Sequence, residues 1–142
     1  MLQLKATHMM ETLGIEIKEM DKDRVVMTMP VDDRTRQPYG MLHGGASVVL
    51  AESAASYGTA LNIDLDRQMG VGLEINANHL RPKQDGVVTA TAVPVHRGRT
   101  TMIWDIRITD EQGKLVCISR CTVAIVSVDR SVSGVSDGPS HV

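Results

Sequence analysis

Residues 44–63 read GGASVVLAESAASYGTALNI, and this stretch decides the fold of the chain. Its residues are almost all small or apolar, and Glu52 is the only charged residue among them. The pattern predicts a helix that is buried on all sides. Because burial penalises the charged form of a carboxyl group, Glu52 is the first residue that needs a functional explanation.

The start of this helix has a second unusual feature, a pair of glycines, Gly44 and Gly45, that follows His43. Glycines leave the backbone N–H groups of a helix N-terminus accessible, and partial positive charge gathers at that end. A cradle suited to negative charge and a lone carboxylate therefore occupy one short stretch of the chain.

Extended segments surround the predicted helix. A short helix at residues 4–13 and a hairpin precede it, and four segments separated by polar or glycine-bearing turns follow it as an antiparallel meander. An apolar helix followed by a long antiparallel sheet predicts an α+β fold in which the sheet wraps around the helix. The expected extended segments are residues 15–20, 24–29, 70–80, 87–96, 100–109 and 114–128.

The bulk composition limits the possible partners. A chain of 142 residues is the size of one domain, which we expect at residues 1–128, followed by a disordered tail at 129–142 that is rich in Ser and Gly. The formal charge of −2 gives no overall attraction to nucleic acid or to anionic membranes. The apolar helix contains Glu52, three serines and Gly58, so we do not expect it to span a membrane.

The two cysteines, Cys117 and Cys121, stand four residues apart in a predicted strand. That spacing corresponds to roughly 13 Å, which is too long for a disulfide bond. Reduced thiols and the lack of a signal-like N-terminal segment predict a cytoplasmic protein.

The residues around the helix start resemble the signature of hotdog-fold acyl-CoA thioesterases. The similarity is to the branch that uses a glutamate and hydrolyses aroyl-CoA thioesters, including hydroxybenzoyl-CoA and dihydroxynaphthoyl-CoA. It implies a hotdog fold, in which a long central helix is wrapped by an antiparallel sheet. The positions that carry the resemblance are Gln37, His43, Gly44, Gly45, Glu52 and Ser56.

The resemblance also implies a role for each residue. Glu52 would attack the thioester or activate water, and Ser56, one helical turn further on, would orient it. Gln37 and the Gly44 amide would hold the thioester carbonyl, and His43 would assist that pocket. Physical chemistry supports this division, because hydrolysis develops negative charge on the carbonyl oxygen and preorganised donors stabilise it.

Further candidates for substrate binding come from the predicted strands. His79 ends a row of apolar residues, 71, 73, 75 and 77, that we place on one strand face. The turn at residues 97–100 offers guanidinium groups and free amides suited to phosphate. By the resemblance, this turn and the loop after His79 lie near the nucleotide of coenzyme A. The candidates are His79, Arg81, Gly98, Arg99 and Thr100.

The spacing of Gly44 and Glu52 predicts a shared active site. Eight residues separate them, about 12 Å along one helix, whereas both must lie about 3 Å from the same carbonyl group. Two copies with antiparallel helices would bring Gly44 of one against Glu52 of the other. We therefore predict an obligate homodimer, and the resemblance adds pairing of dimers into a homotetramer.

The leading hypothesis is hydrolysis of an acyl-CoA thioester, with an aromatic acyl group favoured by the resemblance. No metal or other cofactor is expected, because the His and Cys residues lack ligand spacing and the CoA thioester is the substrate. Glu52 could form an anhydride or act as general base. Two alternative functions stay open: a hotdog dehydratase or hydratase that pairs His43 with Glu52, and a non-catalytic acyl-CoA-binding domain.

Overall fold

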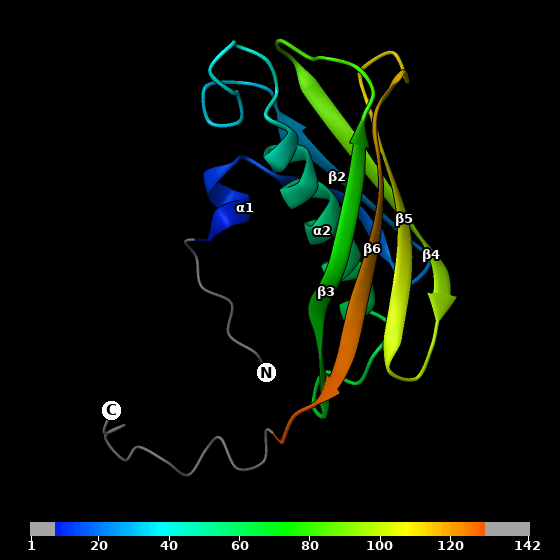
Figure 1. Ribbon diagram of the computed structural model, residues 1–142. Helices are drawn as coiled ribbons and strands as arrows, with labels where there is room; N and C mark the ends of the chain where they lie inside the picture. Colours follow the sequence, from blue (N-terminus) through cyan, green and yellow to red (C-terminus); the bar gives the residue numbers. More distant parts are fainter. Residues whose placement is uncertain (1–7, 130–142) are drawn as a thin grey trace, which may run out of the picture.

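A computed structural model describes residues 8–129, which form a six-stranded antiparallel sheet with one long helix, α2, lying across it (Figure 1). The strand order is β1-β2-β4-β5-β6-β3. This arrangement confirms the predicted α+β fold. The elements are α1 (Met9–Thr12), β1 (Glu16–Asp21), β2 (Arg24–Pro30), α2 (Gly44–Ala60), β3 (Gln68–His79), β4 (Val87–Arg97), β5 (Thr101–Thr109) and β6 (Leu115–Ser127).

The helix α2 buries one face rather than all sides. Small residues along that face allow a close approach to the sheet, and Gly58 lies directly against the ring of Trp104. The indole Nε1 of Trp104 donates a hydrogen bond to Thr59 Oγ1 at 2.9 Å. Glu52 and Ser56 lie on the other, half-buried side of the helix. The expectation that α2 is buried all round is therefore wrong for one copy of the chain.

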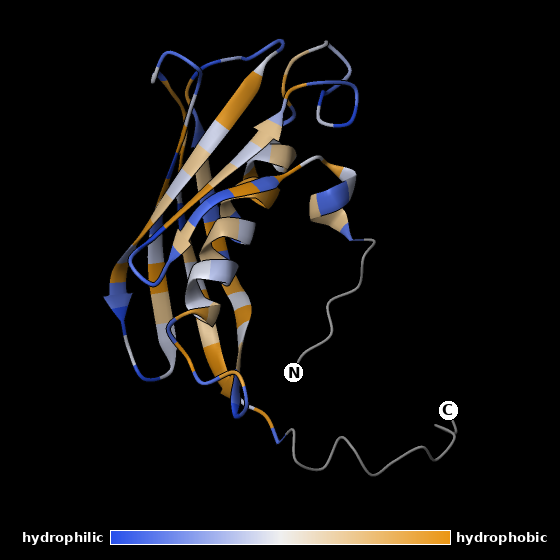
Figure 2. Ribbon diagram, turned by 180° about the vertical axis from the view of Figure 1, so that it is seen from behind, coloured by the Kyte–Doolittle hydropathy of each residue, from blue (hydrophilic) through white to orange (hydrophobic). Residues whose placement is uncertain are grey.

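The inner face of the sheet supplies most of the remaining core. Side chains alternate along the strands, so that every second residue of β2, of β5 and of the first half of β4 is buried. Figure 2 shows hydrophobic positions along these strands. Burial of each large apolar side chain stabilises the fold by about 1.5–3 kcal/mol. The core therefore holds α2 in a fixed position over the sheet.

The expected meander is correct only for β4, β5 and β6. β3 pairs with β6 at the edge of the sheet and not with β4, the next strand along the chain. The connection at residues 80–86 crosses the end of the sheet to reach β4. Alternating hydrophobicity identifies a strand but not its neighbour, which is why the sequence placed β3 wrongly.

A β-bulge in β3 changes which residues face the helix. The register shifts between Gly72 and Glu74, so that Leu73 is the extra residue. Gly72 faces α2, since a Cβ atom there would lie 2.9 Å from Glu52 Oε1, whereas Ile75 packs against the core after the bulge. Leu73 is 65% exposed. Uninterrupted alternation predicts one face for residues 71, 73, 75 and 77. The bulge makes this prediction wrong, because residues 71 and 73 do not share the face of residues 75 and 77.

Several expectations concern the chain ends and the thiols. The helix predicted at residues 4–13 corresponds to α1 where the chain is described, and residues 1–7 and 130–142, including nearly all of the predicted tail, lie outside the described residues. Cys117 and Cys121 are buried free thiols, which confirms that no disulfide joins them. Among residues 8–129, no helix has the length and apolar character needed to cross a membrane.

Candidate active site

A tight turn before α2 fixes the amide of Gln37. Its backbone N–H donates to Met41 O at 2.7 Å, and the N–H of Gly40 donates to Gln37 O at 2.9 Å. Gly40 has φ +90°, a conformation that favours glycine. The side-chain Oε1 of Gln37 accepts a hydrogen bond from Tyr39 N–H. The Nε2 group of Gln37 makes no hydrogen bond to residues 8–129, so its two donors stay available in the described part of the chain.

Two further hydrogen bonds hold the loop that leads into α2. Leu42 N–H donates to Lys83 O at 2.7 Å, and His43 N–H donates to Thr35 O at 2.8 Å. Lys83 is fixed in turn by an ion pair of 2.6 Å between its Nζ and Glu111 Oε1. That hydrogen bond lowers the pKa of Glu111 and raises the pKa of Lys83. The start of the helix is thus anchored to the β3–β4 connection.

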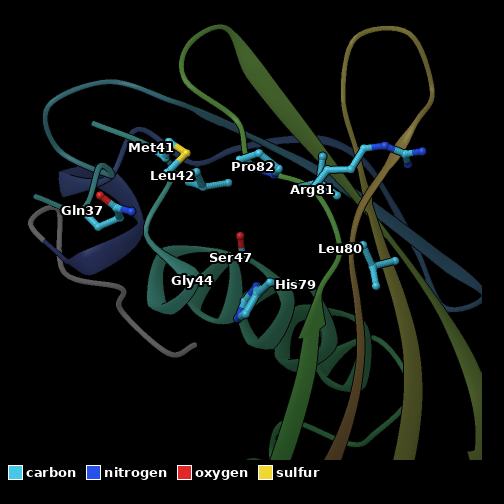
Figure 3. Close-up of a pocket in the computed structure, with 10 residues that line it drawn as sticks. Gln37, Met41, Leu42, Gly44, Ser47, His79, Leu80, Arg81 and Pro82 are labelled. Atoms are coloured by element: carbon cyan, nitrogen blue, oxygen red, sulfur yellow. The ribbon is translucent and has the colours of Figure 1, made fainter. Parts of the chain in front are cut away.

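Four of the predicted residues meet in one cavity of about 330 Å³ at the N-terminus of α2 (Figure 3). The His79 ring lies against Gly44, where a Cβ atom would come within 2.7 Å of Nε2. A side chain at position 44 would therefore displace His79. The predicted residues that line this first cavity are Gln37, Gly44, His79 and Arg81.

His43 lies on the other side of the helix start. It caps α2, and its Nδ1 accepts a hydrogen bond from Gly45 N–H at 2.8 Å. Because Nδ1 is the acceptor, the ring presents its Nε2–H as a donor. The ring lines a second cavity of about 530 Å³, together with Met9, Leu13 and Val49. The structure therefore does not bring His43 into the first cavity.

The carboxylate of Glu52 lies two turns along α2, outside the lining of the first cavity. It contacts β3 at Gly72, which leaves room for it. Within residues 8–129, no ion pair or hydrogen bond engages this carboxylate. Burial, together with the negative charges of Glu52 and then Glu74, raises the pKa of Cys121 to about 12. Glu52 is therefore an unpaired acid close to the sheet.

Ser56 is half-buried on the same side of α2 as Glu52. Across the described part of the chain, its hydroxyl makes no hydrogen bond to the Glu52 carboxylate. Its role in orienting Glu52 therefore stays a prediction.

The basic residues divide between the two ends of the sheet. Arg81 donates from Nη1 to Leu115 O at 3.0 Å, and its guanidinium points away from His79 (Figure 3). Arg97 donates to Lys22 O at 3.1 Å and pairs with Asp23, so it is not a free guanidinium as the sequence had suggested.

The predicted phosphate turn joins β4 to β5 at the end of the molecule opposite the N-terminus of α2 (Figure 1). Gly98 N–H donates to Thr101 O at 2.8 Å, and Thr100 O accepts from Ile125 N–H at 2.8 Å. Arg99 is exposed. One chain therefore does not bring this turn together with Arg81.

Comparison with known proteins identifies the family. Residues 39–117, more than half of the chain, match the sequence profile of the thioesterase superfamily. The chain belongs to the thioesterase superfamily. A 1,4-dihydroxy-2-naphthoyl-CoA hydrolase from Listeria monocytogenes is 56% identical over 115 residues, which cover 81% of this chain and 93% of the relative.

Solved structures agree with this family. A thioesterase from Pseudomonas aeruginosa, with a glutamine replaced by alanine, has a TM-score of 0.82 and 50% identity over 84% of this chain and 86% of that one. A thioesterase from Staphylococcus aureus, also with a glutamine replaced by alanine, has a TM-score of 0.82 and 46% identity over 84% of this chain and 98% of that one. The protein is thus a thioester hydrolase with the hotdog fold, as the resemblance predicted.

Sequence reasoning missed two residues of this thioesterase. Ser47 is buried and lines the first cavity, one turn after Gly44. The spacing of three residues, which places both on one helix face, could have found it. Gly72 makes room for Glu52, and a glycine within a strand is a known sign of a bulge or a close approach.

The described part of this thioesterase holds no group of three or more His, Cys, Asp or Glu side chains arranged to bind a metal ion.

Proposed function

We propose that this thioesterase hydrolyses an acyl-CoA thioester to the free acid and coenzyme A, with Glu52 as nucleophile or general base. The observation that carries this proposal is the unpaired carboxylate of Glu52 beside Gly72. An ion pair would make the carboxylate a weaker base and a weaker nucleophile. An unpaired carboxylate can attack a carbonyl carbon or take a proton from water.

The donors for the thioester carbonyl are the Gly44 N–H and the Gln37 amide. Gly44 begins α2, where N–H groups lack partners within the helix. Gln37 lines the same cavity with its Nε2 unused. Removal of one such donor typically costs about 10² to 10³ in kcat, so two of them supply a large part of the catalysis.

The active site we propose is shared between two copies of the chain. Glu52 and Gly44 lie eight residues apart on one straight helix, about 12 Å. β3 is an edge strand with exposed apolar side chains at Met69, Val71 and Leu73. Such an edge favours pairing with a second copy, which would set two α2 helices side by side. Pairing of dimers into a tetramer stays a prediction.

The same two-fold arrangement unites the basic residues. Antiparallel subunits turn opposite ends of their sheets toward one site, so Arg81 of one subunit and the turn at residues 98–100 of the other could contact one CoA nucleotide. His43, with its Nε2–H donor, would reach the substrate from the second cavity.

The relatives support an aromatic acyl group and the choice of residues. The Listeria relative is named for a dihydroxynaphthoyl-CoA substrate. The Staphylococcus thioesterase has been solved with a glutamine and, separately, with a glutamate replaced by alanine. Those two positions are 15 residues apart, the same separation as Gln37 and Glu52.

Glu52→Gln tests the proposal. We expect kcat for release of free CoA from aroyl-CoA thioesters to fall about 10³-fold, because the amide neither attacks nor takes a proton. Glu74→Gln, which removes an equal charge from β3, is the matched control and should keep wild-type kcat. Near-normal kcat for Glu52→Gln would overturn the assignment. Single turnover in ¹⁸O-water separates the mechanisms, because label in the Glu52 carboxylate indicates an anhydride.

A further inference from the structure

The hydroxyl of Ser47 is buried but has no partner in the protein. Ser47 is 1% exposed, and its side chain makes no hydrogen bond with any atom of residues 8–129. Figure 3 shows this hydroxyl pointing from α2 into the first cavity, between Gln37 and His79 in that view.

The other buried hydroxyl groups of the described chain are all satisfied. Thr35 donates to Pro30 O at 2.8 Å. Thr59 donates to Ala55 O at 2.9 Å, and Ser119 donates to Asn76 O at 2.8 Å. A buried polar group without a partner is costly, so the exception at Ser47 calls for a ligand that completes it.

The cavity around Ser47 suits a small, largely apolar group that carries a polar substituent. Its walls are mainly apolar, and its volume of about 330 Å³ lies at the lower end of the range for small-molecule sites. Four polar side chains also line it: Gln37, Ser47, His79 and Arg81. The apolar lining residues are Met41, Leu42, Leu80, Pro82 and Val116.

We propose that Ser47 determines substrate specificity: its hydroxyl hydrogen-bonds a ring hydroxyl of an aromatic acyl group held in the first cavity. A serine hydroxyl both donates and accepts, so it can pair with a phenol in either sense. The inference rests on the proposed hydrolysis of an aroyl-CoA thioester and adds the residue that recognises a substituent of the aromatic ring. Ser47 differs from Gln37 and Gly44, which we assign to the thioester carbonyl.

A matched set of substrates tests this role. We would measure kcat/KM for benzoyl-CoA and its 2-, 3- and 4-hydroxy derivatives with the wild type and with Ser47→Ala. The wild type should prefer at least one hydroxylated substrate by about tenfold, the value of one neutral hydrogen bond. In Ser47→Ala the preference should vanish, with the benzoyl-CoA value changed less than about threefold.

Ser119→Ala is the control, because it removes a buried serine hydroxyl that already has a partner. It should lower the melting temperature and leave the substrate preference intact. Ser47→Ala should keep or raise the melting temperature, since it removes an unsatisfied group. If Ser47→Ala changes the substrate preference without lowering the stability, and Ser119→Ala does the reverse, Ser47 contacts the ligand and does not serve only the fold.

Three outcomes would overturn the inference. An unchanged preference in Ser47→Ala would show that Ser47 does not contact the ring substituent. An equal loss for all four substrates would assign Ser47 to the shared CoA portion or to the scaffold. A wild type without any preference would remove the basis for the role. In each of these cases, continued hydrolysis would leave the proposed function standing. A wild type that cleaves aliphatic CoA thioesters but none of the four aromatic ones would refute the aromatic class, and with it this role of Ser47, but not thioester hydrolysis.

Discussion

The N-terminal end of α2 and its middle differ in what they provide. At the N-terminal end, backbone hydrogen bonds fix the loop that carries Gln37. Gln37 and Gly44, which both carry hydrogen-bond donors, line the first cavity. In the middle, Glu52 lies beside a bulged edge strand whose apolar side chains are exposed. In the proposed function, the N-terminal end provides the site for the thioester carbonyl but no acid, and the middle provides the acid but no carbonyl site.

Under the proposed function, one chain therefore carries two incomplete halves of a site. A second copy would complete each half. Its Glu52 would supply the nucleophile or base that the first cavity lacks, and its first cavity would hold the thioester carbonyl on which Glu52 acts. In the proposed homodimer, two antiparallel copies would complete both halves and form two equivalent sites.

Gln37→Ala removes a donor from the N-terminal end and should have the largest effect of the next three tests. We expect kcat to fall about 10²-fold with a smaller change in KM, because the amide stabilises charge that develops in the transition state. Steady-state kinetics with an aroyl-CoA substrate would measure it. Gln112→Ala, in an exposed turn, is the control. A raised KM with unchanged kcat would place Gln37 in ground-state binding only.

Gly72→Ala perturbs the other half, beside the acid. Its Cβ would lie 2.9 Å from Glu52 Oε1, so the carboxylate must shift. We expect about a tenfold loss of kcat, in keeping with the sensitivity of catalysis to small displacements. Gly70→Ala is the control, because its Cβ would meet Val123 and Thr59 rather than Glu52. Equal losses of kcat in both variants would attribute the effect to strand packing.

The buried thiol of Cys121 tests how tightly the middle of α2 packs against the sheet. We expect no measurable reaction of this thiol with a thiol reagent in the native protein. Its pKa of about 12 means that the thiolate forms only as the pH approaches that value, so at pH 8 about one thiol in 10⁴ is ionised. A thiol reagent at pH 8 should label neither cysteine of the native protein and both after denaturation. Rapid labelling of native Cys121 would show that the region under Glu52 opens.

Local sequence spacing predicted much of the N-terminal half. His43, Gly44 and Gly45 are consecutive, and the helix they begin follows from the apolar run, so the cradle could be placed from sequence. Gly72 signals either a bulge or a close approach, but the sequence does not decide between the two, and only the structure shows that Leu73 is the extra residue that reverses the strand faces. The pairing of β3 with β6 depends on long-range packing. That the Ser47 hydroxyl lacks a partner within the described residues follows from the positions of all the atoms around it, and the spacing of residues in the sequence does not give those positions.

The most direct test of the shared site is complementation between Glu52→Gln and Gln37→Ala. Each variant alone should be nearly inactive. When the two are co-expressed in equal amounts, half of the dimers should be mixed, and each mixed dimer has one intact site, so the mixture should recover about a quarter of wild-type kcat. Activity no higher than the average of the two separate variants would show that Glu52 and Gln37 act within one chain, and would contradict the account.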